Sequence, residues 1–231
     1  MQIEASTIFG LALSKKQQEQ FSAYAQMLTE ANAVMDLTAV GEDAIEARHF
    51  LDSLALCQVA DFSGKSLIDI GTGAGFPGLP LKIAVPSLQL TLLDALQKRV
   101  NFLEGVSQSL GLEHVTCVHA RAEEWVAQAG KRESFDYATS RAVARLDVLA
   151  ELALPYVKIG GSLLAMKALD SNAEIQAAQN AIEILGGQVA RIEEYTVPGA
   201  AVVRRIVEIK KVGETPAAYP RRFARIQKKP L

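Results

Sequence analysis

Two aspartates and three glycines are spaced as in a loop that binds a small molecule. In the stretch SLIDIGTGAGFPGLPL, Asp69 stands near the end of an apolar run, and Gly71, Gly73 and Gly75 follow at alternate positions. Glycines there let the backbone turn tightly and approach a ligand with no Cβ between them. Asp94 ends the next apolar run, LQLTLLD, where a carboxylate can accept hydrogen bonds from ribose hydroxyls. The pattern predicts a site for a nucleoside-containing cofactor.

The glycines fit two cofactor loops. Gly73, Gly75 and Gly78 satisfy the GxGxxG pattern of dinucleotide-binding loops, whereas Gly71, Gly73 and Gly75 form GxGxG with an aspartate two residues ahead. The aspartate after the second strand fits a nicotinamide nucleotide and S-adenosylmethionine equally well. A third interpretation is a structural turn, in which Asp69 caps the loop and the second aspartate is solvated.

The elements that must position this loop begin with two helices. Ser14 is a plausible N-cap for the first helix, whose periodicity fades near Asn32. Its expected inward face consists of Phe21, Tyr24, Ala25 and Leu28. A second helix is predicted over about residues 43–59, with Phe50, Leu51, Leu54 and Ala55 inward.

After Gly64 the pattern changes to alternating strands and helices. The predicted strands are SLIDI, LQLTLLD, HVTCVHA, FDYATS and GGSLLAMKA. Helices are predicted around Leu79, over residues 98–110, around Glu123, over residues 146–156 and over residues 172–185. Such alternation implies a mostly parallel, doubly wound α/β sheet.

Two further strands, QVARIEEYTV and AVVRRIVEIKK, are joined through Pro198 and Gly199. Because this connection is short, the two strands must pair antiparallel. A parallel sheet closed by an antiparallel last strand resembles the class I S-adenosylmethionine-dependent methyltransferase fold, which is Rossmann-like and seven-stranded. We therefore expect an N-terminal helical cap over residues 1–63, a methyltransferase domain over 64–212 and a basic C-terminal tail over 213–231.

Several ordered motifs together resemble one methyltransferase family. They are ANAVMDLTAV, RHFLDSL, LIDIGTGAGFPGLPLKI, LLDALQKRVNFL, ARAEE and TSRAVA. In this order they resemble the RsmG (GidB) family, closely over about residues 20–167 and loosely elsewhere. The resemblance implies transfer of a methyl group from S-adenosylmethionine to N7 of a guanine in bacterial 16S ribosomal RNA, with S-adenosylhomocysteine as product.

The chemistry of an N7 target agrees with the segment after the fourth strand. Guanine N7 carries an in-plane lone pair and no proton, so methyl transfer needs alignment and electrostatics more than a strong base. The segment TSRAVARL contains neither an Asn/Asp-Pro-Pro-aromatic motif nor a Pro-Cys nucleophile, and Cys117 has no adjacent proline. No catalytic residue is therefore assigned, and Arg141 and Arg145 are the candidates.

The resemblance implies roles for the cofactor-binding residues. Gly71, Gly73 and Gly75 would approach the methionine part and Asp94 would bind the ribose. Phe76 would pack on the ligand, although a loop aromatic can equally dock into the core. Ala122 and Glu123 stand at the adenine position, where Glu123 could instead be a solvated acid at a helix start. Arg141 would face the open end of the cofactor.

Cations near the end of the chain suggest RNA contacts. Residues 219–231 contribute +5 to a total net charge of −2, so the remaining 218 residues sum to −7. The candidate RNA-binding residues are Arg145, Lys167, Arg221, Arg222, Arg225, Lys228 and Lys229. Arg145 could equally be a surface arginine, and Lys167 a solvated lysine at a strand end.

The tail has a second interpretation. It resembles the YPRRxGxPxKxPL ending of many family members, but Ala224 and Ile226 replace the glycine and the first later proline. These replacements make the tail more apolar, so it could fold along the acidic body as a strap held by Phe223, Ile226 and Leu231. Whether the tail binds RNA or folds back stays open at this point.

Composition narrows the class and the location. With 231 residues, 49% of them hydrophobic, the chain can bury the core of one domain with a small appendage. The absence of a long apolar run and of a signal-peptide layout predicts no membrane contact and a cytoplasmic location. Cys57 and Cys117 are expected to be buried, reduced thiols, and no metal site is expected. We further expect a monomer, acting on naked 16S RNA or on an assembling small-subunit particle.

His49 has two interpretations as well. It could line the cleft from the helical cap, or it could bond Asp52 three residues later in a structural role, which is the favoured one. His114 and His119 have no partners that suggest a catalytic or metal site. Two other functional classes remain, a Rossmann-type oxidoreductase and an RNA-binding module with a vestigial cofactor pocket. Bound nicotinamide would reveal the first, and calorimetry with S-adenosylmethionine would distinguish the second.

Overall fold

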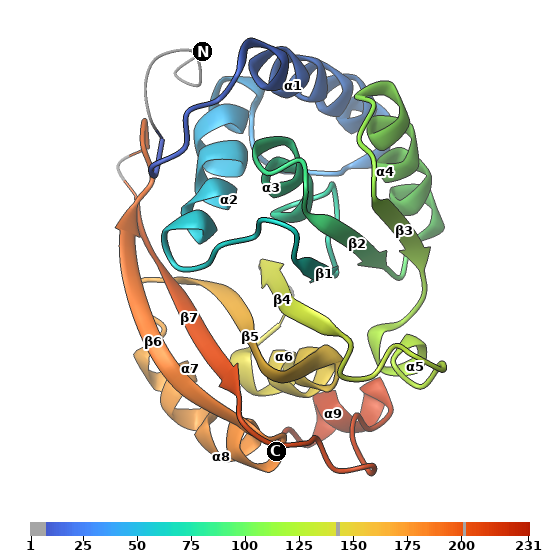
Figure 1. Ribbon diagram of the computed structural model, residues 1–231, viewed down its shortest axis with the longest axis vertical. Coiled ribbons are helices and arrows are strands. Elements are labelled where there is room, and N and C mark those ends of the chain that lie inside the picture. Colours follow the sequence, from blue (N-terminus) through green and yellow to red (C-terminus); the bar gives the residue numbers. More distant parts are fainter. Residues whose placement is uncertain (1–7, 142–143, 201) are drawn as a thin grey trace.

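The computed structural model describes residues 8–141, 144–200 and 202–231, and it has three layers with one sheet in the middle (Figure 1). The strands are β1 Ser66–Ile70, β2 Gln89–Asp94, β3 Val115–His119, β4 Phe135–Arg141, β5 Val157–Ala168, β6 Gly187–Thr196 and β7 Val203–Lys211. The α-helices are α1 Lys15–Met35, α2 Asp52–Leu54, α3 Gly78–Ala84, α4 Gln97–Ser109, α5 Ala122–Trp125, α6 Leu146–Ala153, α7 Asn172–Ala177, α8 Gln179–Ile184 and α9 Phe223–Lys228. The remaining helical segments are η2 Glu42–Ala44, η3 Glu46–Leu51, η4 Ala55–Gln58 and η5 Leu154–Tyr156.

The sheet has seven strands in the order β3-β2-β1-β4-β5-β7-β6. All pairs among β1 to β5 are parallel, and β7 lies antiparallel between β5 and β6. The predicted fold class and the antiparallel hairpin are therefore confirmed. The strand order reverses between β1 and β4, and ligands of open α/β sheets bind at the carboxyl ends of the strands at such a point.

Helices cover both faces of the sheet. One core joins Phe21 and Leu28 of α1 to Leu79 of α3 and to Leu67 and Leu92 of the sheet. A second core lies against the other face, where β-strand residues pack on α6 and α8. Figure 1 shows α1 to α4 on one side of the strands and α5 to α9 on the other. The helical cap thus shares its core with the sheet.

The first helix follows the prediction and extends further. Ser14 caps α1 in a capping box, because its Oγ accepts from Gln17 N and the Gln17 side chain accepts from Ser14 N. The helix continues past Asn32 to Met35, and the Asn32 side chain accepts from Thr38 N at 2.8 Å. The loop after α1 is thereby held against the helix end.

The second helix is not the regular one expected over residues 43–59. Its chain winds successively as the 3₁₀ segment η2, the π-helical η3, the short α2 and the 3₁₀ segment η4. His49 and Asp52, at this change of winding, are both buried and bonded to distant parts of the chain. We attribute the irregular winding to these tertiary contacts, which override local periodicity.

Other boundaries differ from the prediction in smaller ways. The helix expected over residues 172–185 is split at Ala178 into α7 and α8, and β5 begins at Val157 with a register shift against β4. The tail contains a helix, α9, that the sequence did not indicate. Of the predicted elements, residues 1–7 of the cap, residues 142–143 after β4 and Ala201 of the last strand lie outside the described residues. The domain boundaries at residues 63 and 212 stay a prediction.

Across the described ranges, the longest helix is too polar to cross a membrane, and none of the other helices would span one.

Candidate active site

A cleft of about 590 Å³ opens at the carboxyl ends of β1, β2 and β4. Its walls come from the cap, the glycine loop, the end of β2 and the end of β4. The lining residues are Leu37, Thr38, His49, Gly71, Thr72, Gly73, Ala74, Phe76, Asp94, Ala95, Leu96, Arg99, Arg121 and Arg141. A smaller pocket of about 100 Å³ adjoins it, because both are lined by Gly71, Asp94, Ala95 and Arg121. The structure therefore brings most of the predicted cofactor residues into one place.

Asp69 shapes the glycine loop from inside the protein. Its Oδ2 accepts from Thr72 Oγ1 at 2.7 Å and from Gly78 N, at the start of α3, at 2.8 Å. The side chain is fully buried, and this burial raises the pKa of Asp69 to about 6. The capping role that the sequence offered for Asp69 is thus realised. Its Oδ1 has no hydrogen-bond partner among the described residues.

Two glycines of the loop have different surroundings. Both Gly73 and Gly75 have positive φ, at +62° and +105°. A Cβ on Gly75 would lie 2.6 Å from Leu79 Cδ1 and from Tyr24 Oη, whereas a Cβ on Gly73 would meet nothing within 4 Å. Gly73 therefore faces the open cleft, and Gly75 is needed for the packing of the loop on α1 and α3.

Asp94 lies where the two cavities meet. Its carboxylate accepts from Gly73 N at 3.0 Å and from Leu96 N at 2.9 Å, and Arg99 Nη1 lies 3.5 Å from Oδ2. The arginine contact is long and partly exposed, so one side of the carboxylate can still accept hydrogen bonds from a ligand. This arrangement fits a ribose, whose hydroxyls are donors.

Phe76 is stacked between two other rings. Its ring lies 5.5 Å from that of Tyr24 and 4.3 Å from that of His49, with interplanar angles of 26° and 16°. Phe76 also lines the cleft while only 5% of its surface is exposed. Its position is compatible with either role considered for it, and its contact with a ligand stays a prediction.

Arg141 joins the end of β4 to the cap. Its guanidinium donates to Arg48 O at 3.0 Å, to Asp52 Oδ2 at 3.0 Å and to His49 Nδ1 at 2.8 Å. It also lies 5.0 Å from the centre of the Phe76 ring. The expected hydrogen bond between His49 and Asp52 is therefore wrong. Both side chains instead bond to Arg141.

His49 is neutral and its ring is held from two sides. Burial, together with the nearby Arg141, lowers the pKa of His49 to about 3. Because a guanidinium can only donate, Nδ1 accepts from Arg141, and the remaining proton on Nε2 points to Thr38 Oγ1 at 2.7 Å. His49 thus lines the cleft, as the first interpretation expected. It is also engaged structurally, through Arg141 and Thr38 in place of Asp52.

Asp52 is fully buried and balances the arginines around it. Its Oδ1 accepts from Tyr195 Oη at 2.7 Å and lies 3.3 Å from Arg204 Nε, while Oδ2 accepts from Arg141. Tyr195 and Arg204 come from the β6–β7 hairpin, so one carboxylate ties the cap to β4 and to the last two strands.

The smaller pocket lies at the predicted adenine position. Ala122 and Glu123 line it from the start of α5, and Ala122 O accepts from Tyr156 Oη, which fixes this corner on the core. Leu152 and Phe223 complete the wall opposite the sheet. Apolar walls with one acid suit a planar base, so the pocket fits the role expected for residues 122 and 123.

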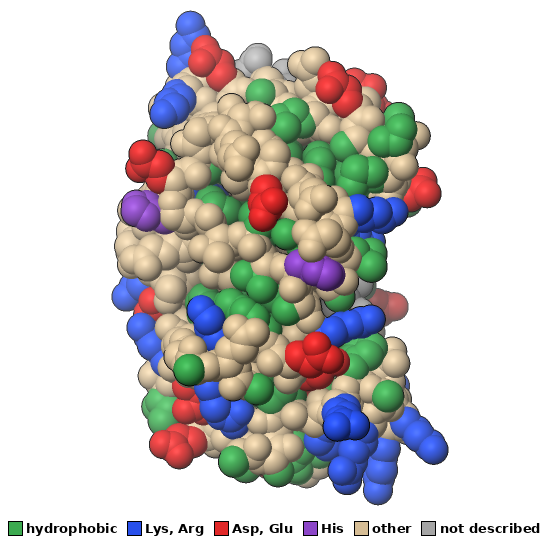
Figure 2. All heavy atoms as spheres, turned by 90° about the vertical axis from the view of Figure 1, so that its right-hand side faces the viewer, with side chains coloured by type: hydrophobic (Ala, Val, Ile, Leu, Met, Phe, Trp, Pro, Cys, Tyr) green, Lys and Arg blue, Asp and Glu red, His purple; other side chains and the backbone are tan. Residues whose placement is uncertain are grey.

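The predicted RNA-binding residues are not all free. Lys167 Nζ donates to Ala144 O at 2.7 Å and to Glu174 Oε1 at 2.6 Å, and exposed Arg145 pairs with Asp147 at 3.0 Å. Arg221 donates from its backbone N and Nε to Glu151 Oε1, each at 2.8 Å. Among the candidate RNA-binding residues of the tail, the exposed ones are Arg222, Arg225, Lys228 and Lys229. Figure 2 shows Lys and Arg side chains gathered at the lower end of the molecule, where α9 lies in Figure 1.

Sequence reasoning missed several residues of the site. Arg99 and Arg121 lie in motifs that carried the family resemblance but received no role, while Tyr195 and Arg204 carried no local signal. Phe223 was considered only for the strap. These side chains reach the site from distant parts of the chain, so spacing could not reveal them.

The two cysteines are free thiols. Burial raises the pKa of Cys117 to about 11 and that of Cys57 to about 12, so neither is a thiolate at neutral pH. Within the part of the chain that the structure describes, no group of three or more His, Cys, Asp or Glu side chains could hold a metal ion.

Comparison with known sequences gives a consistent result. A family model described as GidB, rRNA small subunit methyltransferase G, matches residues 17–203. A protein of Clostridium botulinum (strain Eklund 17B / Type B) named Ribosomal RNA small subunit methyltransferase G is 46% identical over 99% of this chain and 96% of its own length. One of Acetivibrio thermocellus with the same name is 44% identical over 99% of this chain and 95% of its own. These matches confirm the resemblance found in the sequence.

Solved structures share the fold at low sequence identity. TYW2 of M. jannaschii, in complex with AdoMet, superposes with a TM-score of 0.57 at 12% identity, over 76% of this chain and 79% of that chain. TrmN of Thermus thermophilus superposes with a TM-score of 0.55 at 18% identity, over 70% of this chain and 48% of that chain.

Proposed function

The chain belongs to the rRNA small subunit methyltransferase G (GidB) family, and on that premise we propose that its site methylates N7 of a guanine in 16S ribosomal RNA. It is an S-adenosylmethionine-dependent ribosomal RNA methyltransferase of the class I fold. The cofactor supplies an electrophilic methyl group, and S-adenosylhomocysteine is left as product. The remaining question is what this chain's own residues contribute.

We propose that the two adjoining cavities hold the two ends of the cofactor. The Gly71 to Gly75 loop borders the larger cleft at the methionine end, with Phe76 beside it. Asp94, at the junction, accepts from the ribose hydroxyls, and Ala122 with Glu123 borders the adenine pocket. The support is geometric, since these residues from separate loops line one continuous edge of the sheet.

The observation that carries the N7 assignment is the hydrogen bonding of His49, the histidine that lines the cleft. His49 could deprotonate a substrate only through a free lone pair, but Nδ1 accepts from Arg141 and Nε2 carries the proton. Guanine N7 needs no deprotonation, so this locked imidazole is compatible with it. A neutral histidine thus acts as a wall of the cleft.

Charge balance in the cleft supports the same target. Methyl transfer from a sulfonium places a positive charge on the guanine, which an unpaired cation nearby would disfavour. Arg141 faces the cleft, but its charge is offset by Asp52 at 3.0 Å. The pair holds the Arg141 guanidinium in place and reduces the positive charge that it presents to the cleft.

We propose that the substrate RNA approaches over α9, where Arg222, Arg225, Lys228 and Lys229 are exposed. Arg145 lies on the surface after β4 and is a further candidate, although its charge is paired with Asp147. Lys167 is bonded to Ala144 and Glu174, and Arg221 to Glu151, so we propose that they hold these segments in place. Phosphate contacts of this kind provide affinity, and base contacts in the cleft provide specificity.

We further propose that the enzyme is a cytoplasmic monomer with three parts, namely the cap 1–63, the methyltransferase domain 64–212 and the tail 213–231. The shared core of the cap and the sheet is compatible with a single folding unit around the site. Its substrate would be 16S RNA, either naked or in an assembling small subunit.

The test is methyl transfer to RNA from cells that lack this protein. Purified enzyme and labelled S-adenosylmethionine are incubated in parallel with naked 16S RNA and with small-subunit particles, and the product is mapped by mass. One modified guanine whose glycosidic bond becomes labile, as for N7-methylguanine, is expected. Methylation of another base, or of another guanine atom, would contradict the proposal.

A further inference from the structure

The adenine pocket is completed by the C-terminal tail. Besides the ends of β1 and β2 and the start of α5, its lining includes Leu152 of α6 and Phe223, the first residue of α9. Phe223 is half-buried and packs against Val148 and Leu152 together with Ile226. A residue almost at the end of the chain therefore reaches the cavity that begins at Gly71.

The helix that carries Phe223 is fixed to the body of the protein. Ile226 is fully buried. Just before the helix, Arg221 forms a multidentate contact with Glu151, whose carboxylate is fully buried. This pairing raises the pKa of Arg221 and keeps its guanidinium charged. The two contacts anchor α9 on α6, so its first residue has a defined position.

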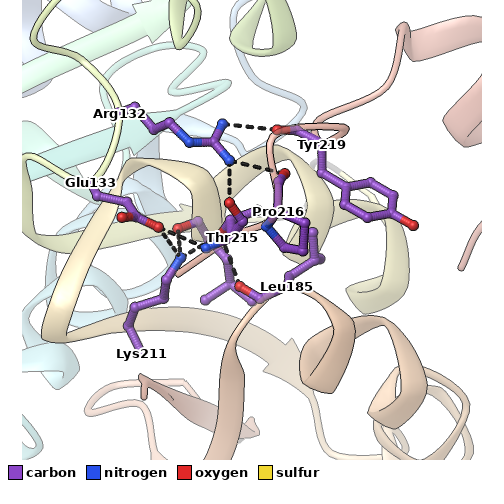
Figure 3. A network of polar contacts seen from close by, with 8 residues as sticks. Arg132, Glu133, Leu185, Lys211, Thr215, Pro216 and Tyr219 are labelled. Atoms are coloured by element: carbon purple, nitrogen blue, oxygen red, sulfur yellow. Dashed lines mark hydrogen bonds and ion pairs between the residues drawn. The ribbon is translucent and has the colours of Figure 1, made fainter. Parts of the chain in front are cut away.

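A second network fixes the chain just before the tail helix (Figure 3). Arg132 donates to Thr215 O at 2.6 Å and to Tyr219 O at 2.8 Å. Buried Lys211 donates to Glu133 Oε1 at 3.0 Å, and Glu133 also accepts from Thr215 N. The segment from β7 to Tyr219 is thus held to the loop before β4, and the tail is a built part of the domain.

The exposed cations of the tail lie on α9 and at its two ends. Arg222, Arg225, Lys228 and Lys229 are exposed, whereas Ile226 is buried and Phe223 packs with it against Val148 and Leu152. Arg121, which lines both cavities, lies with its guanidinium carbon 5.8 Å from the centre of the Phe223 ring. One short helix therefore has an apolar side chain at the cofactor pocket and cations on the surface.

We propose that Phe223 is a cofactor-binding residue that forms the outer wall of the adenine subsite, and that α9 thereby couples RNA binding to cofactor binding. This inference rests on the proposed function. An aromatic ring beside the pocket contributes apolar contact with the purine, provided that α9 stays docked. RNA bound to the exposed cations of α9 would stabilise the docked helix further against local opening, and would thereby raise cofactor affinity. The cofactor would raise RNA affinity by the same factor.

The first experiment measures binding of S-adenosylhomocysteine by calorimetry without RNA. Phe223→Ala is expected to weaken binding about five- to tenfold. Phe223→Leu, which keeps an apolar wall, should retain most of the wild-type affinity. Gln227→Ala, an exposed site on the same helix, is the matched control and should bind like wild type. Phe223→Ala should also weaken the binding of methylthioadenosine, which lacks the amino-acid part, by the same factor, since Phe223 lies at the adenine end.

Thermal melting of each variant, read by circular dichroism, separates loss of the wall from loss of the fold. Wild-type affinity in a folded Phe223→Ala protein would overturn the inference. If wild type itself binds no S-adenosylhomocysteine, the proposed function fails instead. The two failures are therefore distinguishable.

The second experiment repeats the titration with a saturating 16S RNA fragment. Wild type should bind S-adenosylhomocysteine at least about twofold more tightly with RNA than without it. A variant with Arg222, Arg225, Lys228 and Lys229 all changed to Gln should keep its RNA-free affinity and lose this increase. If RNA, at concentrations that saturate this variant, raised its affinity for S-adenosylhomocysteine as much as that of wild type, the coupling would be overturned.

Discussion

Arg141 and Asp52, separated by 89 positions in the sequence, form an ion pair of 3.0 Å that joins the end of β4 to the helical cap. Asp52 is fully buried and also contacts Arg204 and Tyr195, so its carboxylate is the centre of a network linking three parts of the fold. Because Arg141 borders the cleft and contacts both His49 and Phe76, this pair sets the position of the cleft wall.

Removing the charge of Asp52 should therefore be costly. Asp52→Asn leaves two arginines facing a neutral amide in a buried site, and we expect a loss of about 2 to 4 kcal/mol in the free energy of unfolding. Urea denaturation measures this loss in the free energy of unfolding. Glu194→Gln, which removes the carboxylate paired with Arg205 at the surface, is the control and should cost less than about 1 kcal/mol. Equal effects of the two substitutions would contradict the central role of Asp52.

Asp94 should govern cofactor affinity. In the proposed site, Asp94→Ala would remove one or two hydrogen bonds to the ribose, each contributing about 1.5 to 3 kcal/mol when an ionised partner is involved. Affinity for S-adenosylmethionine should therefore fall at least tenfold. Calorimetry measures the affinity, and Asp170→Ala at an exposed site is the control. A folded Asp94→Ala protein with wild-type affinity would show that the ribose lies elsewhere.

Two alanine substitutions in the glycine loop should have separable effects. At Gly75 a Cβ meets Leu79 and Tyr24, so Gly75→Ala should lower the melting temperature strongly. At Gly73 it enters open space in the cleft, so Gly73→Ala should cost only about 1 kcal/mol of stability from the positive φ, yet it should weaken cofactor binding. Melting curves and calorimetry on both variants check this. The idea fails if Gly73→Ala proves the less stable of the two.

His49 should make the protein less stable in acid. Its pKa is about 3 when folded, against an ordinary value near 6.5, so below pH 6.5 the unfolded chain binds a proton that the folded one does not. The contribution of His49 to the free energy of unfolding is fully present above pH 6.5 and falls as the pH decreases toward 3. At pH 4.5 about 2 to 3 kcal/mol of it is lost. His49→Gln should remove this part of the pH dependence.

The measurement compares unfolding free energies of wild type and His49→Gln from pH 8 to pH 4.5. The difference between the two proteins is the relevant quantity, because Asp69, whose folded pKa is raised to about 6, acts in the opposite direction in both. A difference that does not change with pH would show that folding leaves the pKa of His49 unshifted.

The tail should show two separate effects. Arg221→Ala leaves Glu151 buried without its partner, so the melting temperature should fall while the salt dependence of RNA binding stays nearly unchanged. Neutralising the four exposed cations should leave the melting temperature nearly unchanged and reduce the slope of log affinity against log salt by about 2 to 3. Titrations at several salt concentrations, with melting curves, check both. A reduced slope for Arg221→Ala would place that arginine on the RNA.

Much of the architecture follows from local patterns in the sequence. Short apolar segments alternating with helical segments predicted the strands, and the short connection at Pro198-Gly199 predicted the antiparallel hairpin that β6 and β7 form. The glycines after β1 and the aspartate after β2 predicted one edge of the sheet, where the cleft indeed lies. These features depend on neighbouring residues or on the common direction of parallel strands, so the sequence alone determined them.

The partners of the charged groups were decided only by the tertiary structure. His49 and Asp52 are three residues apart, yet each bonds to Arg141, because an irregular helix packs over the end of β4. Arg221 and Arg222 are neighbours, yet one is paired with a buried carboxylate and the other is exposed, because the side of α9 that docks is set by Phe223 and Ile226. Such pairings depend on how helices pack on the sheet across long sequence separations, and local spacing carries no information about that packing.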